Sequence, residues 1–408
     1  DSQFNQTMIK LERYNHTVVQ KELTRHKAYH RKGMDDRMQK IYLDYNASTP
    51  LAPEVVDAMQ PLLNNYYGNP SALHWAGKPV KELLHKARKQ VSNLIGSSPS
   101  EVTFTSGGSE ANNFALKGFY FKNQHKGKHI ITSKIEHPAI MNPCKFLGNV
   151  GARVTYVGVD QYGRVSTEEI EKSITKDTIL ITIMHSNNET GTLQPIVEIG
   201  EIAERYGIAF HTDASQSVGK VPIDVNALKV DMLTIAGHKL YAPKGIGALF
   251  IRNEVEVEPL IHGAGHENGL RAGTENTLLA VGLGKACEIA SLQISNSMLK
   301  ELTNYFWRQL KVEFGEMVVL NGHPEERLPN TLNVSFVRRI GQDLLDKIPD
   351  LAASTGSACH AGSIELSPVL KEMNVPEEIG MGAIRFSLGR YTTKGEIDTV
   401  IKGFKEIY

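Results

Sequence analysis

Short apolar runs alternate with amphipathic stretches along the chain from residue 41 onward. The runs are rich in β-branched residues and have the length of strands, whereas apolar residues in the longer stretches recur at helical spacing. The predicted strands are 129–133, 153–159, 179–185, 208–213, 231–237 and 246–252. The predicted helices between them include 166–174 and 196–207. This alternation predicts an α/β domain with a mainly parallel sheet covered by helices on both faces.

The C-terminal part of the chain follows a different pattern. A long amphipathic helix is predicted around 296–314, then strands at 331–337 and 383–389, and then a terminal helix. This order predicts a smaller α+β domain. The predicted organisation is therefore a large domain and a small one, with the ranges 55–294 for the large domain, and 41–54 and 295–408 for the small domain.

Residues 1–40 differ in composition from the rest of the chain. They are polar and mildly basic, and they contain no apolar run of the kind found in a secretory signal peptide. Acidic residues such as Glu12 and Asp35 count against a transit peptide. We expect a solvated extension, helical or disordered.

Composition and charge limit the classes of partner. Hydrophobic residues make up 41% of the chain, and 45 Lys and Arg balance 45 Asp and Glu. The balance gives no electrostatic reason to expect nucleic acid or an anionic membrane as the main partner. No apolar run approaches the roughly 18 residues of a membrane span.

The three cysteines, Cys144, Cys287 and Cys359, are far apart, which favours a reducing compartment over a disulfide scaffold. The cytoplasm is the expected location, with an organelle left open.

Polar or ionisable residues end or follow four of these predicted strands and a fifth strand-like run, "EVTFT" (101–105). Because ligands of open α/β sheets collect at the carboxyl ends of the strands, we expect these residues to form one site. The five groups are Ser106-Gly107-Gly108-Ser109-Glu110, Glu136-His137, Asn187-Asn188-Glu189, Thr212-Asp213-Ala214-Ser215-Gln216 and His238-Lys239.

Taken singly, each group has an ordinary structural explanation. The Gly-Gly-Ser turn and Asp213 could cap helices, His137 could be a loop or core residue, and Lys239 could be a solvated turn residue, which is how we interpret the nearby Lys244. Taken together, they fit one chemistry. A phosphate seat, a flat aromatic side chain, a carboxylate and a lysine are what a pyridoxal 5′-phosphate (PLP) site requires. The lysine would form a Schiff base with the aldehyde, and the carboxylate would keep the pyridine nitrogen protonated.

The order and spacing of many short motifs resemble one family. The sequence is similar to the cysteine desulfurases and selenocysteine lyases, which have the class V aminotransferase fold. The resemblance covers nearly all of residues 41–408 and implies a PLP-dependent, aminotransferase-like large domain and a homodimer. The matching stretches are 42–50, 68–77, 104–113, 136–140, 187–196, 211–220, 237–250, 271–276, 328–336, 354–363 and 383–390.

The resemblance implies a role for each matching residue of the cofactor site. Lys239 would be the Schiff-base lysine, and Asp213 would pair with the pyridine nitrogen. Gln216 would hydrogen-bond the phenolic oxygen of the ring. His137 would stack on the ring and assist protonation. The implied phosphate ligands are Gly108, Ser109, His238 and, from a second subunit, Thr274.

The resemblance also implies where the substrate binds. Asn188 would lie beside the cofactor and the substrate carboxylate, and Arg385 would clamp that carboxylate. One position departs from the family pattern. Many relatives carry a hydroxyl residue where this chain has Ala236, so one phosphate hydrogen bond is expected to be missing.

Cys359 lies in a segment of small and polar residues, "STGSACHAGS", and is expected to be an exposed thiol. Cys144 and Cys287 lie in helix-like contexts and are expected to be inert. The resemblance implies that Lys239 removes the Cα proton of L-cysteine. The Cys359 thiolate would then take the substrate sulfur as a persulfide, and L-alanine would be released. The sulfur would pass to an acceptor protein, for iron–sulfur cluster assembly or tRNA thiolation.

Three other functions compete with this interpretation. Cys359-His360 and "LSPVL" (366–370) resemble the selenocysteine lyases, which act on L-selenocysteine, whereas "GSAC" and the loop length resemble the desulfurases, which we favour. His211 and Asp213 suggest a metal hydrolase, but no H-E-x-x-H or C-x-x-C spacing is present, so no metal site is predicted. A catalytically silent scaffold subunit would not need an intact Lys239, Asp213 and Cys359.

Overall fold

The computed structural model describes residues 40–294, 297–356, 359–360 and 363–408, and for 359–360 and 363–364 it describes the backbone alone. The predicted extension at 1–40 lies outside the described residues except for Lys40.

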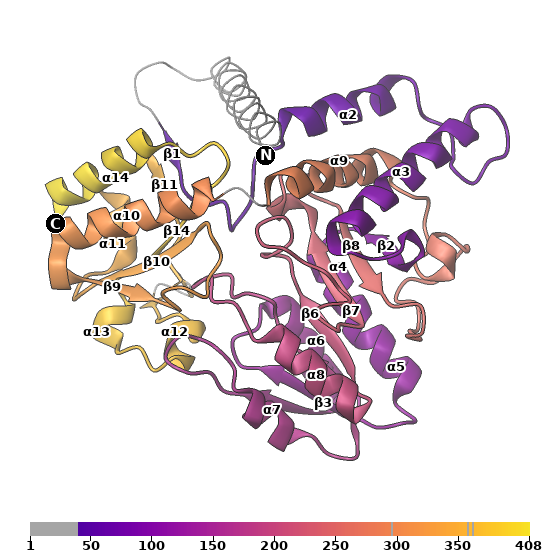
Figure 1. Cartoon of the computed structure of the whole chain (residues 1–408), viewed down its shortest axis with the longest axis horizontal. Helices are drawn as coiled ribbons and strands as arrows, with labels where there is room; N and C mark the ends of the chain where they lie inside the picture. Colours follow the sequence, from indigo (N-terminus) through magenta and orange to yellow (C-terminus); the bar gives the residue numbers. More distant parts are fainter. Residues whose placement is uncertain (1–39, 295–296, 357–358, 361–362) are drawn as a thin grey trace, which may run out of the picture.

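The largest sheet has seven strands in the order β2-β8-β7-β6-β5-β3-β4 (Figure 1). All neighbours from β7 to β4 are parallel, and β8 is antiparallel to both β2 and β7. The predicted α/β fold with a mainly parallel sheet is confirmed. The strands are β2 (Val102–Thr105), β3 (His129–Ser133), β4 (Arg153–Val157), β5 (Thr178–Thr182), β6 (Ala209–Asp213), β7 (Met232–Ala236) and β8 (Gly247–Ile251).

Helices cover both faces of this sheet because neighbouring residues of each strand point to opposite faces. In β3, Ile130 packs in one hydrophobic cluster and Ile131 in another, and both side chains are fully buried. The helices on the Ile131 side are α2 (Pro53–Asn64), α3 (Gly77–Ile95), α7 (Thr167–Ser173), α8 (Ile196–Tyr206) and α9 (Thr277–Gln293). Those on the Ile130 side are α4 (Gly108–Asn113), which continues through a π-helical turn (Phe114–Gly118) into α5 (Phe119–Asn123), and α6 (Pro138–Asn149).

A second core is built mainly from C-terminal residues (Figure 1). Its antiparallel sheet has the order β14-β10-β9. Buried phenylalanines fill the core, among them Phe336 and Phe404, whose rings stack with centroids 4.9 Å apart. The strands here are β1 (Ile41–Tyr42), β9 (Val318–Asn321), β10 (Thr331–Phe336), β11 (Leu351–Ala352), β12 (Cys359–His360), β13 (Ser363–Ile364) and β14 (Ala383–Ser387). The helices are α10 (Met298–Phe314), α11 (Gly341–Asp346), α12 (Pro368–Glu372), α13 (Glu377–Gly380) and α14 (Lys394–Ile407).

The separate cores support the predicted domain boundaries, which stay a prediction. Ile41 and Leu43 pack with the second core and β1 pairs in parallel with β11, whereas Ala52, also within 41–54, packs with the first core. The predicted strand 179–185 ends earlier, at Thr182. On the β3 side, the Met184 N–H donates to the Glu136 carboxylate at 2.9 Å instead of to a strand. On the β6 side, Ile183 and His185 still donate to main-chain oxygens of that strand.

Within the described ranges, no single helix is long and apolar enough to cross a membrane. Only α9 taken together with the segment Met298–Met317 meets the requirements of length and composition, and this pair is bent by 74°.

Candidate active site

A cavity of about 720 Å³ opens at the carboxyl edge of the seven-stranded sheet. Strands β3, β5, β6 and β7 run in the same direction, and β2 joins them because β8 is antiparallel to both β2 and β7. The structure therefore brings together the residues that follow all five strands. The predicted site residues that line this cavity are Gly108, Ser109, His137, Asn188, Asp213, Gln216, His238, Lys239 and Arg385.

Lys239 lies in the short turn Gly237–Lys239 that follows β7. Its Nζ donates to the main-chain oxygens of Asn46 and Ala47, at 2.6 and 2.9 Å. Burial and the positive charge of Arg385 lower the pKa of Lys239 to about 8, although two aspartates act in the opposite direction. A lysine with this pKa is a neutral, nucleophilic amine in a larger fraction of molecules at neutral pH than a solvated lysine.

Asp213 is the last residue of β6, and its carboxylate is held from two sides. Oδ2 accepts from Asn112 Nδ2 at 2.7 Å, and Oδ1 accepts from the Ser215 N–H at 2.9 Å. The side chain lines the cavity although the residue is only 8% exposed. A carboxylate held in this way presents a fixed acceptor to a ligand.

His137 caps α6, and the cap determines its tautomer. Its Nδ1 accepts from the Ala139 N–H at 3.1 Å, so the proton of the neutral ring is assigned to Nε2. Burial, aided by Lys239, lowers the pKa of His137. Burial and the nearby Lys239 and Lys244 lower the pKa of His238 to about 4. Both rings are therefore neutral at pH 7, and His137 offers a flat, uncharged face to the cavity.

The turn before α4 brings backbone close to β7. Gly107 has φ 150° and ψ −179°, a conformation that favours glycine. A Cβ on Gly108 would lie 3.1 Å from Ser215 Oγ and 3.2 Å from the Ala236 Cβ. The missing side chains leave the first N–H groups of the helix accessible, and such groups bind phosphate and other anions. The alanine at 236, which departs from the family pattern, is part of this close contact.

Arg385 in β14 is held between two groups, and its guanidinium retains unused donors. Nη2 pairs with Asp44 Oδ1 at 2.7 Å, and Nη1 donates to the main-chain oxygen of Asn188 at 3.0 Å. Nε is buried and has no hydrogen-bond partner among the described residues. A guanidinium fixed at the wall of the cavity, with a donor to spare, is suited to bind a carboxylate.

Two predicted site residues are not among the described residues that line this cavity. Thr274 lines a neighbouring cavity of about 210 Å³ that shares Ser106 and Gly245 with the first. Its contribution from a second subunit stays a prediction. Cys359 belongs to β12, which pairs with β13, but its side chain lies outside the described residues. Lys244 is exposed, as a turn residue should be, although it lines the cavity.

Three residues that contact predicted site residues were missed by the sequence analysis: Asp44, Asn46 and Lys220. Asp44 pairs with Arg385, Asn46 accepts from Lys239 through its main-chain oxygen, and Lys220 donates to Gln216. The available signal was their position inside two of the stretches that resemble the family, 42–50 and 211–220.

His211, which suggested a metal hydrolase, is engaged inside the sheet. Its Nδ1 lies 2.9 Å from Thr182 Oγ1 and its Nε2 lies 3.1 Å from Thr234 Oγ1. Burial lowers its pKa to about 4. In the part of the chain that the structure describes, no group of three or more His, Cys, Asp or Glu side chains could hold a metal ion. The metal-hydrolase hypothesis therefore has no ligand set among these residues.

Comparison with known proteins agrees with the fold and the site. The sequence model of the aminotransferase class-V family matches residues 41–400. The cysteine desulfurase IscS of Dictyoglomus turgidum is 46% identical over 373 residues, which cover 90% of this chain and 94% of the relative. The cysteine desulfurase of Rattus norvegicus is 42% identical, with coverage of 90% and 82%.

Solved structures give the same result. A NifS-like protein superposes with a TM-score of 0.85 at 36% identity, covering 90% of this chain and 99% of the other. SspA in complex with cysteine superposes with a TM-score of 0.77 at 39% identity, covering 86% and 99%. The chain therefore belongs to the cysteine desulfurases of the class-V aminotransferase family.

Proposed function

We propose that this protein is a PLP-dependent cysteine desulfurase that converts L-cysteine to L-alanine and places the sulfur on Cys359 as a persulfide. The observation that carries the proposal is the meeting of Lys239, Asp213 and Arg385 in one cavity, in a chain that is 46% identical to a cysteine desulfurase. The cysteine found in the SspA structure supports L-cysteine over L-selenocysteine as the substrate, as do the names of the relatives.

The residues present fit PLP. The start of α4 and His238 would hold the phosphate, and the neutral ring of His137 would stack on the pyridine. Asp213 would bind the pyridine nitrogen and Gln216 the phenolic oxygen, while Lys239 would bond to the aldehyde carbon. When bound, PLP supplies an electron sink that stabilises negative charge at the substrate Cα.

The residues of the chain would perform the remaining steps. Arg385 and Asn188 would orient the substrate carboxylate, which places the Cα–H bond near Lys239. The free amine at Lys239 Nζ would take the Cα proton. The Cys359 thiolate would form an S–S bond to the substrate sulfur as the C–S bond breaks. The three-carbon fragment would gain a proton at Cβ, with His137 assisting, regain one at Cα from Lys239 Nζ, and leave as alanine.

A product assay tests the proposal directly. The purified protein is incubated with L-cysteine or L-selenocysteine, and alanine is quantified. We expect a yellow protein that forms alanine from L-cysteine and that is indifferent to chelators. Alanine from L-selenocysteine alone would instead identify a selenocysteine lyase. A colourless protein whose activity is restored by zinc would overturn the proposal.

The pKa of Lys239 predicts how the attachment of PLP depends on pH. In cofactor-free protein, the rate of attachment is expected to rise from pH 6 and to level off above about pH 8, because the neutral amine fraction then saturates. The lowered pKa thus shifts the whole rise to lower pH. Stopped-flow absorbance measures the rate, and Nα-acetyl-lysine is the control, whose rate should rise to about pH 10.4. A protein rate that also rises to pH 10 would contradict the expectation.

We propose that the protein acts as a homodimer that passes sulfur to an acceptor protein. An exposed apolar segment between α2 and α3 supports an interface: Tyr67, Leu73 and Trp75 are 76%, 82% and 78% exposed. Exposed apolar side chains that gather into a patch mark protein interaction sites, and these three lie in one short loop. The cytoplasmic location, and the use of the sulfur for iron–sulfur cluster assembly or tRNA thiolation, stay predictions.

A further inference from the structure

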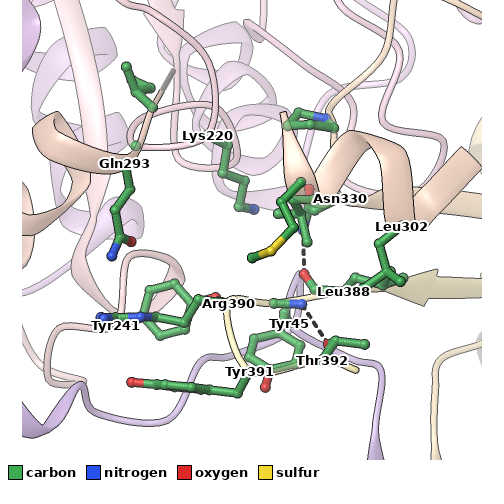
Figure 2. Close-up of a pocket in the computed structure, with 16 residues that line it drawn as sticks. Tyr45, Lys220, Tyr241, Gln293, Leu302, Asn330, Leu388, Arg390, Tyr391 and Thr392 are labelled. Atoms are coloured by element: carbon green, nitrogen blue, oxygen red, sulfur yellow. Dashed lines mark hydrogen bonds between the residues drawn. The ribbon is translucent and has the colours of Figure 1, made fainter. Parts of the chain in front are cut away.

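Lys220 lies in the wall between the candidate active site and a third cavity, distinct from the one that Thr274 lines. This third cavity, of about 120 Å³, lies where residues of both cores meet, and Figure 2 shows Lys220 extending into it between Gln293 and Asn330. Gln216, four residues before Lys220, lines the active-site cavity on the other side. Lys220 therefore reaches a residue of the active site from behind, without lining that cavity itself.

Two amide oxygens accept hydrogen bonds from Lys220. Its Nζ donates to Asn46 Oδ1 at 3.2 Å and to Gln216 Oε1 at 3.1 Å. The orientation of the Asn46 amide is fixed independently, because Oδ1 also accepts from Asn330 Nδ2 at 3.0 Å, and Nδ2 donates to Thr331 Oγ1 at 2.8 Å. Lys220 is thus anchored at a rigid point and holds Gln216 from there.

This contact determines which end of the Gln216 amide faces the cavity. An amide can be turned by 180° with little change in shape, so the hydrogen-bond partners decide its orientation. Lys220 meets Gln216 as a donor, so Oε1 must face it. Nε2 then points the other way and donates one hydrogen to the main-chain oxygen of Asn46 at 3.0 Å. Its second hydrogen has no partner among the described residues and remains for a ligand.

We propose that Lys220 is a positioning residue for the reaction, because it holds the Gln216 NH₂ group toward the phenolic oxygen of bound PLP. The inference rests on the proposed function. Without Lys220, the main-chain oxygen of Asn46 alone would hold the Gln216 amide. An amide that turned would set its oxygen against the phenolic oxygen, and an attractive contact would become a repulsive one.

Lys220 Nζ can donate its hydrogen bonds without being part of an ion pair. Among the described residues no carboxylate forms an ion pair with Lys220. Burial and the positive charges of Lys239 and Arg385 lower its pKa to about 7. Both the neutral and the protonated amine have enough N–H groups for the two contacts.

The test is a pH titration of the absorbance of the bound cofactor. An N–H donor to the phenolic oxygen draws its negative charge away from the proton on the Lys239 nitrogen. Loss of the donor is therefore expected to raise the midpoint of the titration, by about one pH unit in Lys220→Met. Lys220→Arg retains N–H donors and is expected to titrate close to the wild type. If the midpoint of Lys220→Met lies within roughly 0.2 pH units of the wild-type midpoint, far below the expected shift of about one unit, the inference is overturned.

Lys220→Met also removes a positive charge, and a double-mutant cycle separates this effect from positioning. If Lys220 acts through Gln216, Lys220→Met should cause no further shift in a Gln216→Ala background. If it acts by charge alone, the same shift should appear in both backgrounds, which would refute the positioning role. If borohydride fixes no PLP to the wild-type chain, the proposed function itself fails, whereas an unmoved midpoint in loaded protein rejects the Lys220 inference alone.

Discussion

Replacing Lys239 with alanine is expected to lower alanine formation from L-cysteine by at least about a thousandfold. The variant loses the amine that donates to the main-chain oxygens of Asn46 and Ala47 at the cavity wall. In the proposed mechanism this amine is the base that takes the Cα proton. Loss of a general base alone costs about a hundredfold to ten-thousandfold, and loss of the covalent attachment of the cofactor adds to this. Borohydride treatment should no longer fix PLP to the chain.

The control for this experiment is Lys172→Ala, which removes an exposed lysine of α7 that does not line the active-site cavity. It should form alanine at the wild-type rate within about twofold, since surface substitutions away from a site have small effects. Turnover by Lys239→Ala within tenfold of the wild type would show that another group is the base, and the assignment of Lys239 would then be wrong.

Replacing Cys359 with alanine is expected to abolish alanine formation from L-cysteine while leaving the yellow cofactor bound. The structure supports Cys359 as the reactive thiol because it argues against the other two cysteines. Cys144 and Cys287 are fully buried, and burial raises the pKa of Cys144 to about 12 and that of Cys287 further still. Neither forms a thiolate at neutral pH, and the thiolate is the form that attacks sulfur.

Mass spectrometry of the wild type after a brief incubation with L-cysteine should locate one added sulfur atom on Cys359. Cys287→Ala is the matched control and should carry the same persulfide. A persulfide on Cys144 or Cys287, or full turnover of L-cysteine by Cys359→Ala, would contradict the assignment. Turnover of L-selenocysteine alone by Cys359→Ala is compatible with it, because selenium leaves more readily and needs the nucleophile less.

The class of fold and most of the candidate site could be predicted from the sequence. Strand and helix patterns are local, and the carboxyl ends of parallel strands meet at one edge whatever the details of packing. Asp213 ends a strand, and His137 and Lys239 come shortly after one, so their convergence could be predicted. Arg385 could be assigned only through the resemblance to a family, because it lies within β14 of another sheet.

Only the tertiary structure showed what holds these residues in place. Lys239 and Asn46 are 193 positions apart, and Arg385 and Asp44 are 341 apart. No periodicity connects such pairs, because their contact depends on how the two cores pack against each other. Burial is also a property of the folded chain. Lys239 and Lys244 lie in the same turn, yet burial lowers the pKa of Lys239 to about 8 whereas Lys244 is exposed. The sequence placed a lysine at the site, and packing made it an amine that can react at neutral pH.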